Sequence, residues 1–136
     1  MRMMLIATLA ATLLCACGGL RNALVANGNA EHARRDLQKG VKSYESGDYA
    51  KAEKFLKDAL KDGLINRDDQ LIAHKYLAFI NCSSTQEKLC RSEFREAFKI
   101  DPAFKLQPEE AGNPIWAPVY LDIKSEFVHS NTNSLP

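Results

Sequence analysis

The sequence predicts an all-α protein made of two helical hairpins and a C-terminal capping helix. Three observations lead to this prediction. Apolar residues recur at helical spacing on both sides of Gly47-Asp48. The same pattern returns once, 38 residues further along, from Ala59 to Ala97 for example. A last apolar stripe, preceded by Pro118, follows the second copy.

The first predicted hairpin turns at Gly47, which can adopt the positive φ that ends a helix. Small residues at Gly40 and Ala52 are expected to lie opposite each other, where the lack of bulk lets two helices approach closely. The apolar positions of the two helices recur at helical spacing: Leu37, Val41, Tyr44, Ala52, Phe55, Leu56, Ala59 and Leu60.

The second hairpin begins after a connector in which Gly63 ends one helix and Asp68 or Asp69 caps the next. Its turn lacks a glycine, and Ser84 with Glu87 predicts a capping box there. Five positions of the first copy, Gly40, Ala52, Leu56, Ala59 and Leu60, reappear in order as Ala78, Cys90, Phe94, Ala97 and Phe98. An internal repeat of this kind is typical of stacked helical hairpins.

The C-terminal segment is expected to cover the last apolar face, as repeat folds require. Pro118 suits the first turn of a helix whose Val119, Ile123 and Phe127 form one stripe. Trp116 is expected to wedge against the second repeat. Residues 128–136 are predicted to be a disordered polar tail.

The repeat resembles a tetratricopeptide (TPR) motif. The resemblance is carried by a glycine, a Gly-Asp-Tyr turn and an Ala, large apolar, Ala series: Gly40, Gly47, Asp48, Tyr49, Ala52, Leu56 and Ala59. The second copy closes with Asp101-Pro102, as TPR repeats commonly do, whereas the first lacks that proline. The resemblance covers about residues 33–104 and implies a TPR-like domain over 30–127; the alternative is an unrelated hairpin with the same pattern.

The N-terminus predicts a signal peptide over residues 1–16. Arg2 precedes an apolar run, Met3 to Leu14, which is shorter than the roughly 20 residues of a membrane-spanning helix. The run ends in Leu-Cys-Ala-Cys, which resembles the lipobox of bacterial lipoproteins and implies that Cys17 becomes the lipid-modified N-terminus. The alternative is an ordinary secretory signal with a chance cysteine.

Residues 17–29 are expected to be a short lipidated tether that keeps the folded part close to the bilayer. Asn29 is expected to cap a helix that begins near Glu31. Because Gly18 follows the cysteine, the lipoprotein resemblance implies the outer membrane, with the protein on its periplasmic side. Acyl chains anchor a protein firmly, so membrane contact is expected through the lipid only.

The balanced charge limits the possible partners. With 18 Lys and Arg against 17 Asp and Glu, the chain lacks the basic excess that nucleic-acid binding requires, so no nucleic-acid partner is expected. No Gly-x-Ser-x-Gly, phosphate-binding glycine loop or His-Glu-x-x-His motif is present, so no enzymatic activity and no cofactor are expected. The adjacent Glu109 and Glu110 are interpreted as a solvated pair that offsets a helix N-terminus.

Cys82 and Cys90 are the two thiols that remain after lipidation. In an oxidising periplasm an even pair favours a disulfide, here across the second hairpin. Two buried free thiols, or a metal site with His74 as a third ligand, are the alternatives. No metal site is expected.

The TPR resemblance implies that the first helices of the two repeats line a concave groove. Its expected partner-binding residues are Arg34, Leu37, Val41, Tyr44, Lys75 and Phe79. The groove is expected to have an apolar floor, with Arg34 and an exposed Lys75 nearby. Such a groove suits an envelope protein or peptide, bound as a helix or an extended segment. In the competing interpretation Leu37, Val41 and Phe79 are core residues.

The functional expectation is a periplasm-facing outer-membrane lipoprotein that acts as a TPR-type protein-binding adaptor. Assembly of an envelope or secretion complex is the expected setting. The alternative is a regulator or scaffold for a peptidoglycan-modifying enzyme.

Overall fold

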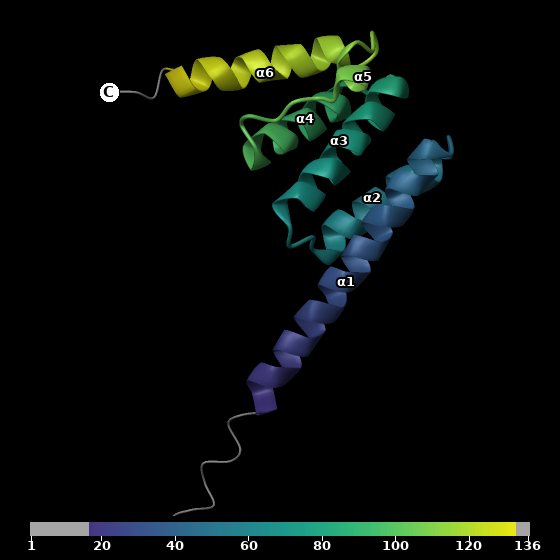
Figure 1. Cartoon of the computed structure of the whole chain (residues 1–136), viewed down its shortest axis with the longest axis vertical. Coiled ribbons are helices and arrows are strands. Elements are labelled where there is room, and N and C mark those ends of the chain that lie inside the picture. Colours follow the sequence, from purple (N-terminus) through teal and green to yellow (C-terminus); the bar gives the residue numbers. More distant parts are fainter. Residues whose placement is uncertain (1–16, 133–136) are drawn as a thin grey trace, which may run out of the picture.

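The computed structural model describes residues 17–132, with side chains described from residue 28 to residue 129. Within this range the chain is all-helical, and its elements are α1 (Cys17–Glu45), α2 (Tyr49–Asp62), α3 (Arg67–Ser83), α4 (Glu87–Ile100), α5 (Pro108–Ala111) and α6 (Ala117–Thr132). The predicted fold class, two helical hairpins followed by a C-terminal helix, is confirmed (Figure 1). The predicted signal peptide, residues 1–16, lies outside the described residues.

Helix α3 is the layer that the two hairpins share. Ala73, Leu77 and Ile80 pack into an apolar cluster with α1 and α2. Ala78 and Phe79 pack into a second cluster with α4, the segment after it and α6. A helix with apolar residues on two sides is buried between neighbours, and Figure 1 shows α3 between the first hairpin and α4. The two hairpins therefore pack as consecutive layers.

The two hairpin turns have the same backbone hydrogen bonds. In each turn two N–H groups donate to carbonyls of the preceding helix: Gly47 to Tyr44, Asp48 to Ser43, Thr85 to Cys82 and Gln86 to Asn81. Gly47 has φ +81° and Thr85 has φ +58°, so both occupy the left-handed region. The internal repeat seen in the sequence therefore extends to the turn geometry, although threonine stands where the first copy has glycine.

The helix caps differ from the expectation at two places. Asn66, and not Asp68 or Asp69, caps α3, because its Oδ1 accepts a hydrogen bond from the amide of Asp68 at 2.7 Å. At α4 the expected capping box of Ser84 and Glu87 was wrong. The left-handed turn uses the residues before Gln86, which becomes the N-cap and makes no side-chain capping bond.

Gly40 marks the close approach of α1 and α2. A Cβ added there would lie 2.7 Å from Cγ of Leu56 and 3.2 Å from its backbone nitrogen. The expected close approach at Gly40 is present, but the residue that faces Gly40 is Leu56, one helical turn beyond Ala52. Ala52 itself is fully buried in the same hairpin.

Both ends of the helical part extend further than expected. Helix α1 begins at Cys17, so residues 17–29, expected to be a tether, are helical, and Asn29 lies inside α1 and does not cap it. Once α1 is nucleated by packing, each added residue gains a backbone hydrogen bond without a new nucleus. Figure 1 shows the N-terminal part of α1 projecting past the end of α2. At the other end α6 continues to Thr132, into the predicted tail, whose residues 133–136 lie outside the described part.

Helix α6 covers α4 as the sequence predicts (Figure 1). Tyr120 and Ile123 are buried, and Val119 and Phe127 pack beside them. The Tyr120 hydroxyl donates a hydrogen bond to the carbonyl oxygen of Phe104 at 2.9 Å. These contacts close the second apolar cluster, which is the role expected of a capping helix.

Ion pairs on the surface fasten α6 to α4. Arg95 binds Glu126 through two nitrogens at 3.0 and 3.1 Å. Arg91 lies 2.6 Å from Asp122 and 2.9 Å from Glu126. The hydrogen bond from Arg95 is the main cause that lowers the pKa of the Glu126 carboxyl. The C-terminal helix is thus held by charge as well as by apolar packing.

Candidate functional site

The six expected groove residues fall into different environments. Leu37 and Phe79 are buried in the two apolar clusters, and Val41 is half-buried against the first cluster. For Leu37 and Phe79 the structure therefore supports the core interpretation. Arg34 is exposed and pairs with Glu31 on its own helix at 3.1 Å. These residues do not form one continuous groove.

Lys75 is not the exposed charge that the sequence analysis expected. Its side chain is 13% exposed, and Nζ lies 2.6 Å from Oε1 of Glu110 in α5. The other oxygen of Glu110 accepts a hydrogen bond from the amide of Gln107 at 3.0 Å. The interpretation of Glu110 as a solvated group was therefore wrong, because α5 folds back against α3 and brings its carboxylate to Lys75.

The aromatic side chains of five positions make a continuous row across both hairpins. We call Tyr49, Tyr44, Tyr76, Phe79 and Trp116 the aromatic row. Tyr44 lies at the centre, with its ring centroid 5.4 Å from that of Tyr49 and 4.7 Å from that of Tyr76. Phe79 continues the row, 6.0 Å from Tyr76 and stacked on Trp116 at 4.3 Å. The row thus joins α1, α2, α3 and the segment just before α6.

Phe79 forms the buried floor of the row, and the other members are accessible from solvent. Tyr49 is 49% exposed; Tyr44, Tyr76 and Trp116 are half-buried, whereas Phe79 is 1% exposed. Lys75 flanks the row, with Nζ 4.8 Å from the Tyr76 ring centroid. Trp116 is held by a hydrogen bond from Nε1 to the carbonyl oxygen of Glu110 at 2.9 Å. The surface therefore combines fixed aromatic area with a lysine–glutamate pair beside it.

The surroundings of Tyr44 and Tyr76 raise the pKa of both hydroxyls. Burial, followed by the neighbouring Tyr49, Tyr76 and Glu110, raises the pKa of Tyr44 to about 12. Burial is also the main cause that raises the pKa of Tyr76, with Glu110 second. Both hydroxyls remain protonated at physiological pH. They can therefore donate hydrogen bonds to a bound group, in addition to the contact area of their rings.

Of the row, Tyr44 and Phe79 were expected to bind a partner, and the expected packing of Trp116 against the second repeat is confirmed by its stacking on Phe79. Tyr76 and Tyr49 were not expected at this surface. Tyr76 had a usable signal, because it lies three residues before Phe79 and shares a helix face with it. Tyr49, the first residue of α2, and Trp116, in the segment before α6, reach the row from other elements. Their proximity depends on tertiary packing, which helical spacing does not encode.

The two cysteines lie where the sequence analysis expects a disulfide. Their Cα atoms are 5.1 Å apart, and the sulfurs of Cys82 and Cys90 are in disulfide contact. The contact joins the end of α3 to the first turn of α4. His74 is occupied elsewhere, because Nδ1 of its ring lies 2.7 Å from Oε2 of Glu93. The geometry therefore favours the disulfide over a metal site that includes His74.

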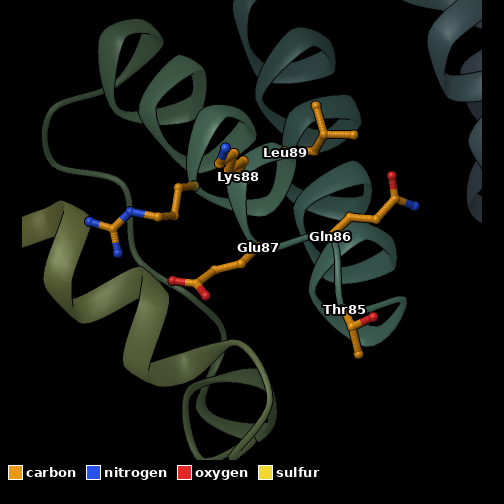
Figure 2. Close-up of a pocket in the computed structure, with 6 residues that line it drawn as sticks. Thr85, Gln86, Glu87, Lys88 and Leu89 are labelled. Carbon is orange, nitrogen blue, oxygen red and sulfur yellow. The ribbon is translucent and has the colours of Figure 1, made fainter.

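A second surface feature is an open hollow of about 470 Å³ at the start of α4. It is lined by Thr85, Gln86, Glu87, Lys88, Leu89 and Arg91. Figure 2 shows the labelled side chains diverging from the start of the helix, with no common point toward which they converge. The hollow shares no residue with the aromatic row, and its lining comes from one short segment. The row, built from several elements, is the better candidate site.

Comparisons with known proteins identify no relative of this chain. No protein-family model matches it, and neither a curated protein nor a solved structure is similar to it. The resemblances to a TPR repeat and to a lipobox therefore stay predictions from the sequence. Among the helices within residues 17–132, none is both long enough and apolar enough to cross a membrane.

Proposed function

We propose that the chain is a periplasm-facing outer-membrane lipoprotein that acts as a TPR-type protein-binding adaptor, with assembly of an envelope or secretion complex as its setting. The aromatic row is the observation that carries the proposal. It lies mainly on α1 and α3, the first helices of the two hairpins, which is the surface that the TPR resemblance implies for a partner.

The chemistry of the row suits a protein or peptide partner. Tyrosine and tryptophan dominate the binding energy of many interfaces, because they offer large rigid area and a polar group with little loss of side-chain entropy. Here Tyr49 is the most exposed member, and Tyr44 and Tyr76 add two neutral hydroxyls beside it. An open surface of this kind matches an extended segment or a helix face better than an enclosed small molecule.

Truncation of Tyr49 tests the row directly. Tyr49→Ser should reduce recovery of the crosslinked partner from cell envelopes by about tenfold or more, since an aromatic hot spot contributes roughly 2 kcal/mol. Its thermal midpoint should change little, because the side chain is 49% exposed. Quantitative pull-down after crosslinking, with a thermal melt of the same variant, measures both effects.

Ile65→Ser is the matched control for that experiment. Ile65 is 73% exposed and lies in the connector between α2 and α3, outside the row. Its truncation removes an exposed apolar side chain of similar character and should leave partner recovery unchanged. Equal recovery with both variants would show that the row is not the binding surface. A peptidoglycan-modifying enzyme as the captured partner would instead favour the regulator alternative.

Lipidation has its own test, motivated by the Leu14 to Cys17 segment. Cys17→Ser should accumulate as an unprocessed precursor without an acyl label, because the modified thiol is missing. Cys15→Ser is the control and should be processed and labelled normally. Metabolic labelling with a fatty acid, followed by a mobility shift on a gel, distinguishes the two. Normal labelling of Cys17→Ser would exclude Cys17 as the anchor.

A further inference from the structure

Three potential metal ligands meet where α2 ends against α1. His32 and Asp36 lie one turn apart on α1, and Asp62 is the last residue of α2. Nδ1 of His32 lies 2.8 Å from Oδ2 of Asp62 and 3.5 Å from Oδ2 of Asp36. One ligand atom from each of the three residues lies within 4.8 Å of the other two. This cluster is at the opposite end of the hairpin from the Gly47 turn.

The burial of Asp36 is the observation that distinguishes this cluster from ordinary surface acids. Its side chain is 6% exposed, although an ionised carboxylate is costly to bury without partners. Lys39 donates a hydrogen bond to Oδ1 at 2.8 Å. Oδ2 faces His32 at 3.5 Å, which is longer than a normal hydrogen bond. Oδ2 of this largely buried side chain therefore faces the cluster, where His32 is its neighbour.

The charges of the cluster leave room for a cation. The carboxylates of Asp36 and Asp62 both lie beside the imidazole of His32. Lys39 supplies a single positive charge, at Oδ1 of Asp36. A divalent ion placed among the three ligand atoms would be bound by the oxygen that Lys39 does not use. Asp62 is partly exposed and His32 is exposed, so the ion can enter from solvent and keep water as a further ligand.

We infer that His32, Asp36 and Asp62 bind a divalent transition metal, with Zn²⁺ as the best fit. One imidazole nitrogen and two carboxylate oxygens are a ligand set that zinc accepts, whereas Mg²⁺ and Ca²⁺ prefer oxygen ligands alone. Tetrahedral zinc with bonds of about 2.1 Å separates its ligand atoms by about 3.4 Å. That separation lies within the 2.8 Å to 4.8 Å spread of the three ligand atoms.

Zinc at this position joins the two helices of the first hairpin at its open end. Because the ligands come from α1 and from the last residue of α2, an ion bound there stabilises only the folded hairpin. The site departs from the sequence analysis, which expects no metal. Helical spacing in the sequence places His32 and Asp36 on one face of a helix. It does not predict that Asp62, on the next helix, lies beside them.

The test uses the purified protein without an affinity tag, after removal of metals with a chelator. Adding ZnCl₂ should raise the thermal midpoint by roughly 5 to 10 °C at a hundredfold excess over Kd. Isothermal titration should give one Zn²⁺ per chain. His32→Ala and Asp62→Asn should remain folded without metal, lose the zinc-dependent rise and bind Zn²⁺ at least tenfold more weakly.

His74→Ala is the matched control, because its ring pairs with Glu93 on the second hairpin, away from the cluster. It should keep the zinc-dependent rise. No rise in the unsubstituted protein, or a rise of the same size in His32→Ala, would overturn the assignment. An equal rise with MgCl₂ would also overturn it, since the effect would then be that of any divalent cation.

Discussion

Phe79→Ala is expected to lower the free energy of unfolding by about 3 to 5 kcal/mol. Phe79 is 1% exposed and lies where both hairpins and the segment before α6 meet. Its ring stacks on Trp116 at 4.3 Å and contacts Phe94 edge-on at 6.3 Å. Truncation removes this contact area and leaves a cavity that helices from both hairpins cannot fill by local relaxation. Urea denaturation followed by circular dichroism measures the change.

The control for this prediction lies in the same row. Tyr49→Ala removes an aromatic side chain of similar size that is 49% exposed, so its effect on stability should stay below about 1 kcal/mol. A domain of this size is stable by about 5 to 15 kcal/mol, so only the Phe79 variant should approach the unfolding threshold at elevated temperature. A loss below 1 kcal/mol for Phe79→Ala would contradict its role as the centre of the core.

Removal of the Cys82–Cys90 cross-link is expected to cost about 2.5 kcal/mol of stability in the chain-entropy model. The short loop that the bond closes restricts the unfolded chain, and that restriction is lost on reduction. The unfolding midpoint in urea should therefore fall when dithiothreitol is added. The native, unreduced protein should show no thiol that reacts with an alkylating reagent.

The internal repeat supplies a matched variant for the same prediction. Ala52 occupies the position in the first hairpin that Cys90 occupies in the second, and both are fully buried. In Cys82→Ser/Cys90→Ala the buried position therefore receives the residue that this packing already accepts. The double variant should be less stable by about the same amount and insensitive to dithiothreitol. Alkylation of both cysteines in the native, unreduced protein would contradict the disulfide.

Helical periodicity accounts for the parts of the fold that were predictable. Leu37, Leu56 and Ile123 are buried where their spacing places them, and Gly47 and Gly63 end helices with positive φ as expected. These features depend on residues within one or two turns of each other. The length of α1 was not predictable in this way, because glycines and asparagines near a helix start weaken helical propensity without forbidding the helix.

The candidate site was predictable only in part, for a different physical reason. Tyr44 and Phe79 follow from helix faces, but the burial of Lys75 depends on Glu110, which is 35 positions away in the sequence. That contact forms because the segment after α4 turns back and places α5 against α3. The same long-range folding brings Trp116 onto Phe79. Sequence spacing within one helix contains no information about the approach of Glu110, whereas the need to cover the last apolar face did predict that Trp116 packs on the second repeat.

The projecting part of α1 bears on where a partner is met. If Cys17 carries the proposed lipid, a continuous helix connects the lipid to the domain in place of the expected flexible tether. A 13-residue coil spans roughly 20 Å, and so does the part of α1 between Cys17 and the level at which α2 ends. The mean distance between the bilayer and the hairpin is therefore similar in the two cases. A coil lets the domain rotate freely about the tether, whereas the helix holds the domain in one orientation relative to the axis that ends at Cys17. Tyr44, near the far end of α1, would then stand about 40 Å from the anchor. When α1 stands upright on the membrane, the aromatic row would thus lie about a helix length away from the lipid and not at the membrane surface.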